Sequence, residues 1–231
     1  MNIHLLSGGA ANAAVTGVQD DFEKETGCAV QATFSAVGAM YDQLVSGTPC
    51  DLVILTRPLI DKLTASGHVV AGSARSLGRV KTGVAVKTGA QHPDVGTREA
   101  LAAALRAARG IYFPDPAKAT AGIHFLNVLQ ALGLDQELSA AFRVYPNGAT
   151  AMQAMADSAE PGLIGCTQVT EINYTPGVDL VANLPLEFEL ATDYTLGICT
   201  QAQQPELAQK LAAMLTGPAS AAKRRQGGFD F

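Results

Sequence analysis

The stretch Ile111–Phe125, IYFPDPAKATAGIHF, constrains the fold of this chain more than any other. It opens as a short apolar run, breaks at Pro114-Asp115-Pro116, passes through small residues and becomes helical in pattern from Ile123. In open α/β sheets, ligands lie beyond the carboxyl ends of strands. A helix that begins there points unpaired N–H groups at an anion. The stretch therefore predicts either an anion-binding loop or, more plainly, an ordinary strand-to-helix connection.

Similar units recur along the chain, because small or polar loops follow several other short apolar runs. Helical segments come next in most cases, and this alternation predicts an α/β fold with doubly wound, mostly parallel sheets. Two further strands, Val80–Val86 and Tyr194–Cys199, are candidates for crossings between lobes. We also expect a helical segment at Leu138–Phe142 and a strand at Phe188–Leu190. The other expected strands are Asn2–Leu6, Cys28–Phe34, Asp51–Leu55, Leu163–Thr167 and Val178–Val181.

Charge and hydropathy exclude two classes of partner. The chain of 231 residues has a net charge of −5 and no basic stripe, which argues against nucleic acid. No apolar run approaches membrane-spanning length. The opening MNIHLLSGG reads as a first strand and turn, so the expected location is cytoplasmic, or periplasmic if a leader was trimmed. The basic run Lys223–Arg225 is expected on a solvated helix face.

The four cysteines show no ligand spacing. Cys28, Cys50, Cys166 and Cys199 form neither a CxxC pair nor a Cys/His pattern, so we expect reduced, mostly buried thiols and no metal site. A bridge between Cys28 and Cys50 in an exported form is the alternative. No cofactor is expected.

Several segments, taken in order, resemble the class II periplasmic binding fold and, within it, the molybdate-binding proteins. The resemblance rests on FEKETG, F-S-A-V-G, G-T-P-C-D-L-V-I, F-P-D-P-x-x-x-x-A-G and L-I-G. It implies two α/β lobes, lobe I at 1–80 and 191–231 and lobe II at 81–190, joined by two crossing strands. A small anion would lie in the cleft between them, held by helix N-termini and hydroxyls.

The chain departs from the molybdate binders at their ligand hydroxyls. The serine they place at the first helix start falls at Ala10, their serine-rich second loop keeps only Ser35, and their ligand tyrosine falls near Thr167. Only the backbone site Ala121-Gly122 carries over unchanged. Because each lost hydrogen bond to a charged ligand is worth about 1.5–3 kcal/mol, we expect poor molybdate binding.

The polar groups expected at the strand ends suit a ligand with several carboxylates better than a compact oxyanion. Arg57 could clamp a carboxylate, with a surface ion pair as the alternative. His124 could act as a base, with a structural hydrogen bond as the alternative. Thr167 could donate to the ligand. The expected polar set is Ser7, Thr56, Arg57, Lys118, Thr120, His124, Asn147, Thr150, Thr167, Gln168 and Glu171.

The chain is also similar to the aconitate isomerases, enzymes built on the same fold. That resemblance implies a cofactor-independent isomerase of a small polycarboxylate, with His124, Thr167 and Arg57 as catalytic candidates. The alternatives are a solute-binding protein of an oxyanion-type ABC transporter, with a permease as partner, and a ligand sensor without chemistry. The ligand-binding candidates are Ser7, Gly8, Gly9, Ala10, Ala36, Val37, Gly38, Thr56, Lys118, Thr120, Ala121, Gly122, Gly148, Ala149, Thr150 and Gln168.

Overall fold

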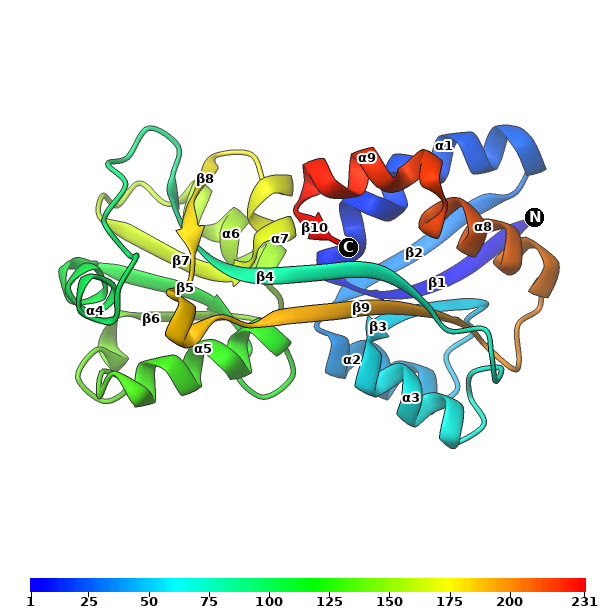
Figure 1. Ribbon diagram of the computed structural model, residues 1–231, viewed down its shortest axis with the longest axis horizontal. Coiled ribbons are helices and arrows are strands. Elements are labelled where there is room, and N and C mark those ends of the chain that lie inside the picture. The colour runs from blue at the N-terminus through cyan, green and yellow to red at the C-terminus, as the bar shows by residue number, and fades with distance from the viewer. The chain divides into compact units, whose positions relative to one another are not determined.

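The computed structural model describes residues 1–231, which form two compact units. Unit 1 contains Met1–Val80 and Thr192–Phe231, and unit 2 contains Lys81–Ala191. The lobe boundaries expected from the sequence, after residues 80 and 190, lie within one residue of this division. The chain leaves unit 1 within strand β4 (Arg75–Lys87) and re-enters it at the start of β9 (Ala191–Ile198) (Figure 1).

Unit 1 is built on a sheet with the strand order β2-β1-β3-β9. The central strand β1 is parallel to β2 and β3, and β9 is antiparallel to β3. Besides β4 and β9, the strands of unit 1 are β1 (Asn2–Gly8), β2 (Ala29–Ser35), β3 (Leu52–Thr56) and β10 (Phe229–Asp230). The helices are α1 (Asn12–Thr26), α2 (Val37–Val45), α3 (Arg57–Ala65), α8 (Pro205–Thr216) and α9 (Pro218–Gly227).

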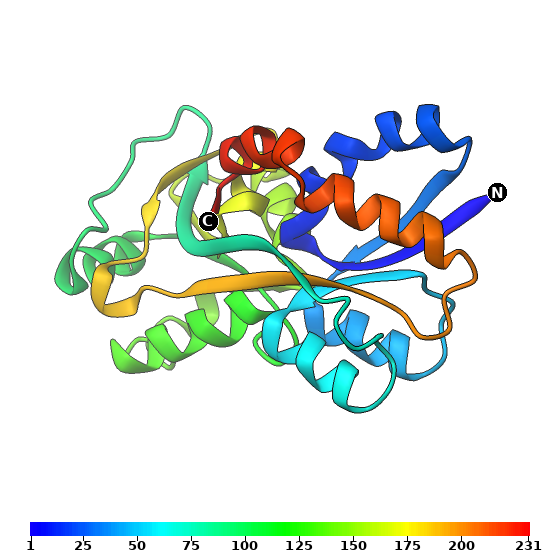
Figure 2. The same ribbon diagram turned by 45° about the vertical axis from the view of Figure 1, so that its right-hand side comes forward.

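The first helix shows how the apolar pattern sets the packing of unit 1. Val15, Val18 and Phe22 recur at helical spacing and are buried, so they form the inner face of α1. Gly27 ends this helix at φ 65°, a left-handed conformation that favours glycine. Helices α8 and α9 pack against α1, as Figure 2 shows. No helix is both long and apolar enough to span a membrane.

Unit 2 has a sheet with the order β4-β7-β5-β6, and β8 pairs with β4. Strand β5 is parallel to β6 and β7, whereas β4 is antiparallel to β7. The strands are β5 (Gly110–Pro114), β6 (Phe142–Tyr145), β7 (Leu163–Gln168) and β8 (Val178–Asn183). The helices are α4 (Arg98–Ala107), α5 (Thr120–Ala131), α6 (Gly148–Asp157) and α7 (Val169–Tyr174).

Strand β5 is buried on both faces, as a doubly wound sheet requires. Phe113 packs edge-on against Phe125 of α5 at 5.4 Å between ring centroids. Tyr112, the next residue back, points to the other face and joins Met152 and Met155 of α6. The alternation in the Tyr112-Phe113 pair thus places α5 and α6 on opposite sides of the sheet.

Two local expectations in unit 2 were wrong. The segment expected as helical, Leu138–Phe142, contains only a 3₁₀ turn at Ser139–Ala141 and then becomes β6. The strand expected at Phe188–Leu190 does not form. Phe188 is the last residue of a 3₁₀ turn, η3 (Leu186–Phe188), and residues 189–190 join no strand. In both places a run of three to five residues carries too little periodicity to separate the alternatives.

The expectation that the basic run Lys223–Arg225 lies on a solvated helix face was wrong for Arg224, whereas Lys223 and Arg225 are exposed. Arg224 of α9 is only 5% exposed, and its guanidinium donates to carbonyls of Leu77, Thr216 and Gly217. Burial is the largest cause that lowers the pKa of Arg224, and the neighbouring charge of Arg225 adds to it. Arg224 therefore holds α9 to the preceding helix end and to β4.

All four cysteines are free and buried, as the sequence indicated. Cys28 precedes β2 and Cys50 precedes β3, and β1 lies between these two strands. Two strand spacings amount to about 9–10 Å, which exceeds the Cα separation of about 7 Å that a disulfide tolerates. The alternative of a Cys28–Cys50 bridge is therefore ruled out.

Candidate functional site

The carboxyl edge of the unit 1 sheet gathers the N-terminal candidates. The parallel register places Gly8 opposite Ser35, and β3 ends nearby at Thr56. A Cβ on Gly8 would lie 2.7 Å from Val37 Cγ1, so only glycine lets α2 begin this close to β1. The structure thus brings the expected Ser7–Ala10 and Ala36–Gly38 stretches together.

Three helical segments begin at this edge without a side-chain cap. They are α2 after Ala36, α3 after Thr56, and the 3₁₀ turn η1 (Gly9–Ala11) that leads into α1. N–H groups at helix starts lack intrahelical partners, and the helix dipole favours a negative charge there. Ser7 is fully buried, and its hydroxyl donates to the Gly8 carbonyl at 2.9 Å. The chemistry of this edge therefore comes from backbone donors more than from hydroxyls.

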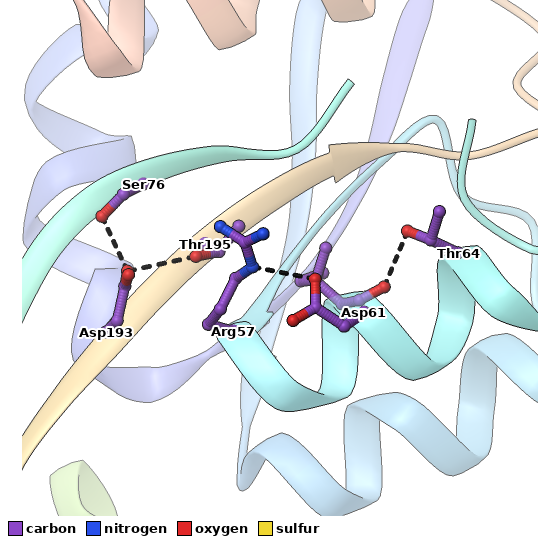
Figure 3. Close-up of polar contacts among 7 residues, drawn as sticks. Arg57, Asp61, Thr64, Ser76, Asp193 and Thr195 are labelled. Carbon is purple, nitrogen blue, oxygen red and sulfur yellow. Dashed lines mark hydrogen bonds and ion pairs between the residues drawn. The ribbon is translucent and has the colours of Figure 1, made fainter. Parts of the chain in front are cut away.

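Arg57 is the first residue of α3 and forms an ion pair along its own helix (Figure 3). Its Nε donates to Asp61 Oδ1 at 2.8 Å, and the Arg57 side chain is 52% exposed. The structure thus contains the surface ion pair that the sequence allowed as an alternative. The role of Arg57 as a carboxylate clamp stays a prediction.

Figure 3 also shows how the two long strands are joined within unit 1. Asp193 Oδ1 of β9 accepts from Ser76 Oγ of β4 at 2.7 Å and from Thr195 Oγ1 at 3.1 Å. Because Asp193 is next to the point where the chain enters unit 1, this contact anchors both crossing strands at that end.

In unit 2, the stretch Ile111–Phe125 contains a helix start that has no side-chain cap. Helix α5 begins at Thr120, three residues earlier than the pattern suggested, and Ala119 provides no side-chain cap. A Cβ on Gly122 would lie 2.2 Å from the Pro114 carbonyl, so glycine is required where α5 presses against the end of β5. The Ala121-Gly122 pair thus permits the close turn, and Lys118 lies exposed in the loop before it.

His124 lies in the second turn of α5, not in the first as expected, and is engaged in a structural hydrogen bond. Its Nε2 is 2.7 Å from the Phe188 carbonyl, and because a carbonyl only accepts, Nε2 must carry a proton. A neutral His124 could therefore accept a proton only at Nδ1. The contact also ties η3 to α5, so the structural alternative for His124 is the better supported one.

The N-terminus of α6 is occupied by groups of the protein itself. Asn147 Oδ1 accepts from Thr150 N and from Thr150 Oγ1, both at 2.9 Å. The backbone N–H groups of Gly148 and Ala149 donate to the carboxylate of Glu171. An internal carboxylate thus lies at this helix start, and the contact of Gly148, Ala149 and Thr150 with an external anion stays a prediction.

Glu171 approaches α6 so closely that Gly148 has no room for a side chain. A Cβ on Gly148 would lie 2.0 Å from both Glu171 Oε2 and Thr167 Oγ1. Thr167 is fully buried and donates to Glu171 Oε2 at 2.6 Å, so this expected ligand donor also serves the internal carboxylate. The sequence holds one signal for this contact. Thr167 and Glu171 are four residues apart, and no obvious cation that could pair with Glu171 follows them.

Burial raises the pKa of Glu171 from 4.5 to about 6, although hydrogen bonds from Thr167 and from the N–H groups of Gln168, Ala149 and Gly148 act to lower it. The folded chain thus binds this proton more tightly than the unfolded chain. The resulting stabilisation is complete below about pH 4.5 and is lost as the pH rises through about 6. The lost free energy amounts to about 2 kcal/mol.

We therefore expect Glu171→Gln to gain stability relative to the wild type as the pH rises from 4.5 to 7. Glutamine cannot ionise, so the variant lacks this one titration, and the difference in unfolding free energy should change by about 2 kcal/mol. Urea unfolding of both proteins at the two pH values measures it. A difference that is the same at both pH values would contradict the raised pKa.

Several buried polar side chains have no hydrogen-bond partner in the protein, among them Gln168, Thr82 and Thr170, the residue before Glu171. Gln168 is 2% exposed, and neither its amide nitrogen nor its amide oxygen is paired. Thr82 of β4 lies directly opposite Gln168 in the antiparallel register, and its buried hydroxyl is also unpaired. Unpaired buried polar groups cost about 1–3 kcal/mol each, so such a pair marks a place where a ligand can be bound.

Gln168 was a candidate from the sequence, but Thr82 was missed. Thr82 lies within the crossing strand β4 between Lys81 and Gly83, where a threonine reads as an ordinary strand residue. Cys166 is fully buried, and burial raises its pKa far above the usual thiol range, so it is a packing residue. No three His, Cys, Asp or Glu side chains lie together in an arrangement that could hold a metal ion.

Two α/β units, each with helix starts and polar side chains at the carboxyl edge of its sheet, are the architecture of the class II periplasmic binding fold. The match to the family model of the bacterial extracellular solute-binding proteins covers residues 3–230, and the chain belongs to that family. The expected α/β, two-lobed fold is thereby confirmed.

Individual relatives include an aconitate isomerase and anion-binding proteins. The chain is 29% identical over 219 residues to the aconitate isomerase of Pseudomonas sp, covering 91% of this chain and 80% of that protein. It superposes on the Azotobacter vinelandii periplasmic molybdate-binding protein with a TM-score of 0.82 at 19% identity, over 99% of each chain. The sulfate-binding protein SubI of Mycobacterium tuberculosis H37Rv gives 0.76 at 14% identity, over 99% of this chain and 86% of that one.

Proposed function

We propose that this protein binds a small polycarboxylate anion and isomerises it without a cofactor, in the manner of aconitate isomerase. The relative named as an aconitate isomerase shares 29% of the aligned residues, whereas the molybdate and sulfate binders share 19% and 14%. Structural similarity at those lower identities indicates the fold alone. The chemistry of the site residues therefore has to indicate the ligand.

The observation that carries the proposal is the buried, unpaired side-chain amide of Gln168, a residue whose backbone N–H donates to the Glu171 carboxylate. An amide offers one N–H donor side and one carbonyl acceptor, and a carboxyl group can meet both when it carries a proton. A tetrahedral oxyanion offers acceptors only, so it can meet the amide N–H of Gln168 but not the amide oxygen. A ligand with several carboxylates, one of them able to share a proton, therefore suits unit 2 better than molybdate.

The proposed reaction is a 1,3-proton shift. A base removes a proton from the methylene carbon next to a carboxylate, the double bond moves by one position, and a proton is returned to the far carbon of the allylic system. Charge that develops on the carboxylate oxygens is stabilised by N–H donors at a helix start of unit 2 such as that of α5. Atoms and charge balance without a redox or metal cofactor.

Glu171 replaces His124 as our proposed base. A base works best when its pKa is near the working pH, and burial raises the pKa of Glu171 to about 6. Its neighbours Thr167 and Gln168 would hold it and the substrate in one place. His124 is left with a structural role because its Nε2 donates to the Phe188 carbonyl.

A second function, binding of an oxyanion or carboxylate for an ABC permease without chemistry, is favoured by the uncapped helix starts in unit 1. A panel of molybdate, sulfate, citrate and both aconitates separates the two. Isothermal calorimetry would report binding, and chromatography would report conversion of cis-aconitate to trans-aconitate. We expect conversion and weak molybdate binding; sub-micromolar molybdate affinity without conversion would support the transport function or a sensor instead.

We also expect Gln168→Leu to raise stability and to weaken binding of the polycarboxylate. Leucine has nearly the same volume and removes two unpaired buried polar atoms, which should stabilise the fold by about 1–3 kcal/mol. Loss of the amide should weaken binding by about 10- to 100-fold. Gln153→Leu is the matched control, because Gln153 is exposed and bonds only Asp157 of its own helix. A Gln168 variant that binds as tightly as the control would argue against this site.

A further inference from the structure

Two of the four thiols lie together at the end of unit 1 where β3 begins and β9 ends. The antiparallel register pairs Leu52 with Ile198, and Cys199 N donates to the Asp51 carbonyl at 3.0 Å. Cys50, one residue before Asp51, is therefore held beside Cys199 although 149 residues separate them in the chain. Neither residue belongs to the ligand site proposed above, so this inference does not depend on it.

The two thiols interact directly. The side-chain hydrogen bond that the Cys199 thiol makes to Cys50 is the largest cause that raises the pKa of Cys199, ahead of burial and the charge of Asp51. Cys50 Sγ also lies 3.1 Å from the Leu52 carbonyl, which fixes its orientation. Both residues are almost fully buried, at 6% and 3% exposed.

Both cysteines also line one cavity of about 400 Å³ in unit 1. The cavity wall includes His4, His68 and Gln201, and it opens to solvent, so a small oxidant can reach thiols that are otherwise covered. Cys28 and Cys166 do not line this cavity. The structure thus separates one paired, reachable set of thiols from two isolated ones.

We propose that Cys50 and Cys199 are a redox-active pair that closes to an intramolecular disulfide. In the step, the Cys50 thiolate attacks a small-molecule disulfide, RSSR, and forms a mixed disulfide with release of one RSH. The second cysteine then attacks the mixed disulfide, the Cys50–Cys199 bond forms, and the second RSH leaves. Two cysteine thiols are oxidised while one RSSR is reduced to two RSH.

The consequence is a covalent link between the start of β3 and the end of β9. A cross-link that closes a long loop stabilises chiefly by restricting the unfolded chain, typically by an amount that raises the Tm of a domain of this size by about 5–15 °C. Since the family to which the chain belongs is described as extracellular, an oxidising surrounding is a natural setting for such a bond.

The test is oxidation of the full-length protein with oxidised glutathione, followed by peptide mapping without reduction. We expect a peptide pair joined through Cys50 and Cys199, a fall from four free thiols to two, and a higher Tm that dithiothreitol reverses. Cys28→Ser should still form the bond. Cys50→Ser and Cys199→Ser should each keep their three thiols or carry glutathione, with no rise in Tm. Stable glutathione adducts on both wild-type residues, or a cross-link through Cys28 or Cys166, would overturn the proposal.

Discussion

Replacing Asp51 with alanine is expected to lower the free energy of unfolding by about 3–5 kcal/mol, among the largest effects of any single change in unit 1. Asp51 is 1% exposed and lies at the start of β3. Its Oδ2 accepts from His4 N at 2.8 Å, and its Oδ1 accepts from Gln203 N at 2.7 Å and Gln204 N at 2.9 Å.

The size of the effect follows from what alanine leaves behind. The carboxylate joins β1 to the start of α8, where Gln203 and Gln204 present the N–H groups that precede the helix. Without it, three backbone donors lose a charged acceptor, and each unsatisfied donor costs about 1–3 kcal/mol if water cannot reach it. The total loss of stability is smaller than three such costs, because water hydrates N–H groups at the start of α8 once the carboxylate is removed.

Asp61→Ala is the matched control, because it removes the same side chain from an exposed site. Asp61 is 56% exposed and pairs only with Arg57 along α3, so its loss should change stability by about 0.5 kcal/mol or less. Chemical denaturation of the three proteins measures both effects. Equal losses for the two variants would show that Asp51 is not the anchor described here.

Asp51 shows which features of the fold the sequence could predict and which it could not. The apolar run after it predicted β3, and its place in the P-C-D-L motif supported the resemblance to a known fold. One of its partners, however, lies on β1, and the other two precede α8 about 150 residues further along the chain. No local sequence pattern reveals such bonds. Elements that depend on local periodicity were predictable, whereas the buried charge contacts that join them were not.

The candidate site shows the same limit. The sequence marked Gly8, Gly122 and Gly148 as ligand-binding candidates at strand ends and helix starts, and the structure shows close packing at each of them. The sequence could not show that an internal carboxylate, Glu171, lies at the start of α6, because this depends on how β7 and α6 pack. It also could not separate an ion-paired Arg57 from a clamp, since exposure and partner are three-dimensional properties.

Glu171→Gln is expected to lower turnover of cis-aconitate by about 10²–10⁴-fold while it changes KM little. Glutamine keeps the size of the side chain and one hydrogen-bond acceptor toward Thr167 and Gly148, so the variant should fold. It cannot take up a proton. In the wild type the rate should rise with pH through about 6, where the carboxyl loses its proton, and then level off. The residual rate of the variant should lack that rise.

The controls separate a base from a residue that only holds α6 in place. Glu189→Gln changes the same kind of side chain at a partly exposed ion pair with Lys81 and should leave turnover unchanged. His124→Gln keeps an amide donor for the Phe188 carbonyl and should also leave turnover nearly intact, because Nε2 is already committed there. A full loss in His124→Gln with normal turnover in Glu171→Gln would return the base to His124. A loss in Glu171→Gln that keeps the wild-type pH profile would assign Glu171 a positioning role, because the titrating group would then lie elsewhere.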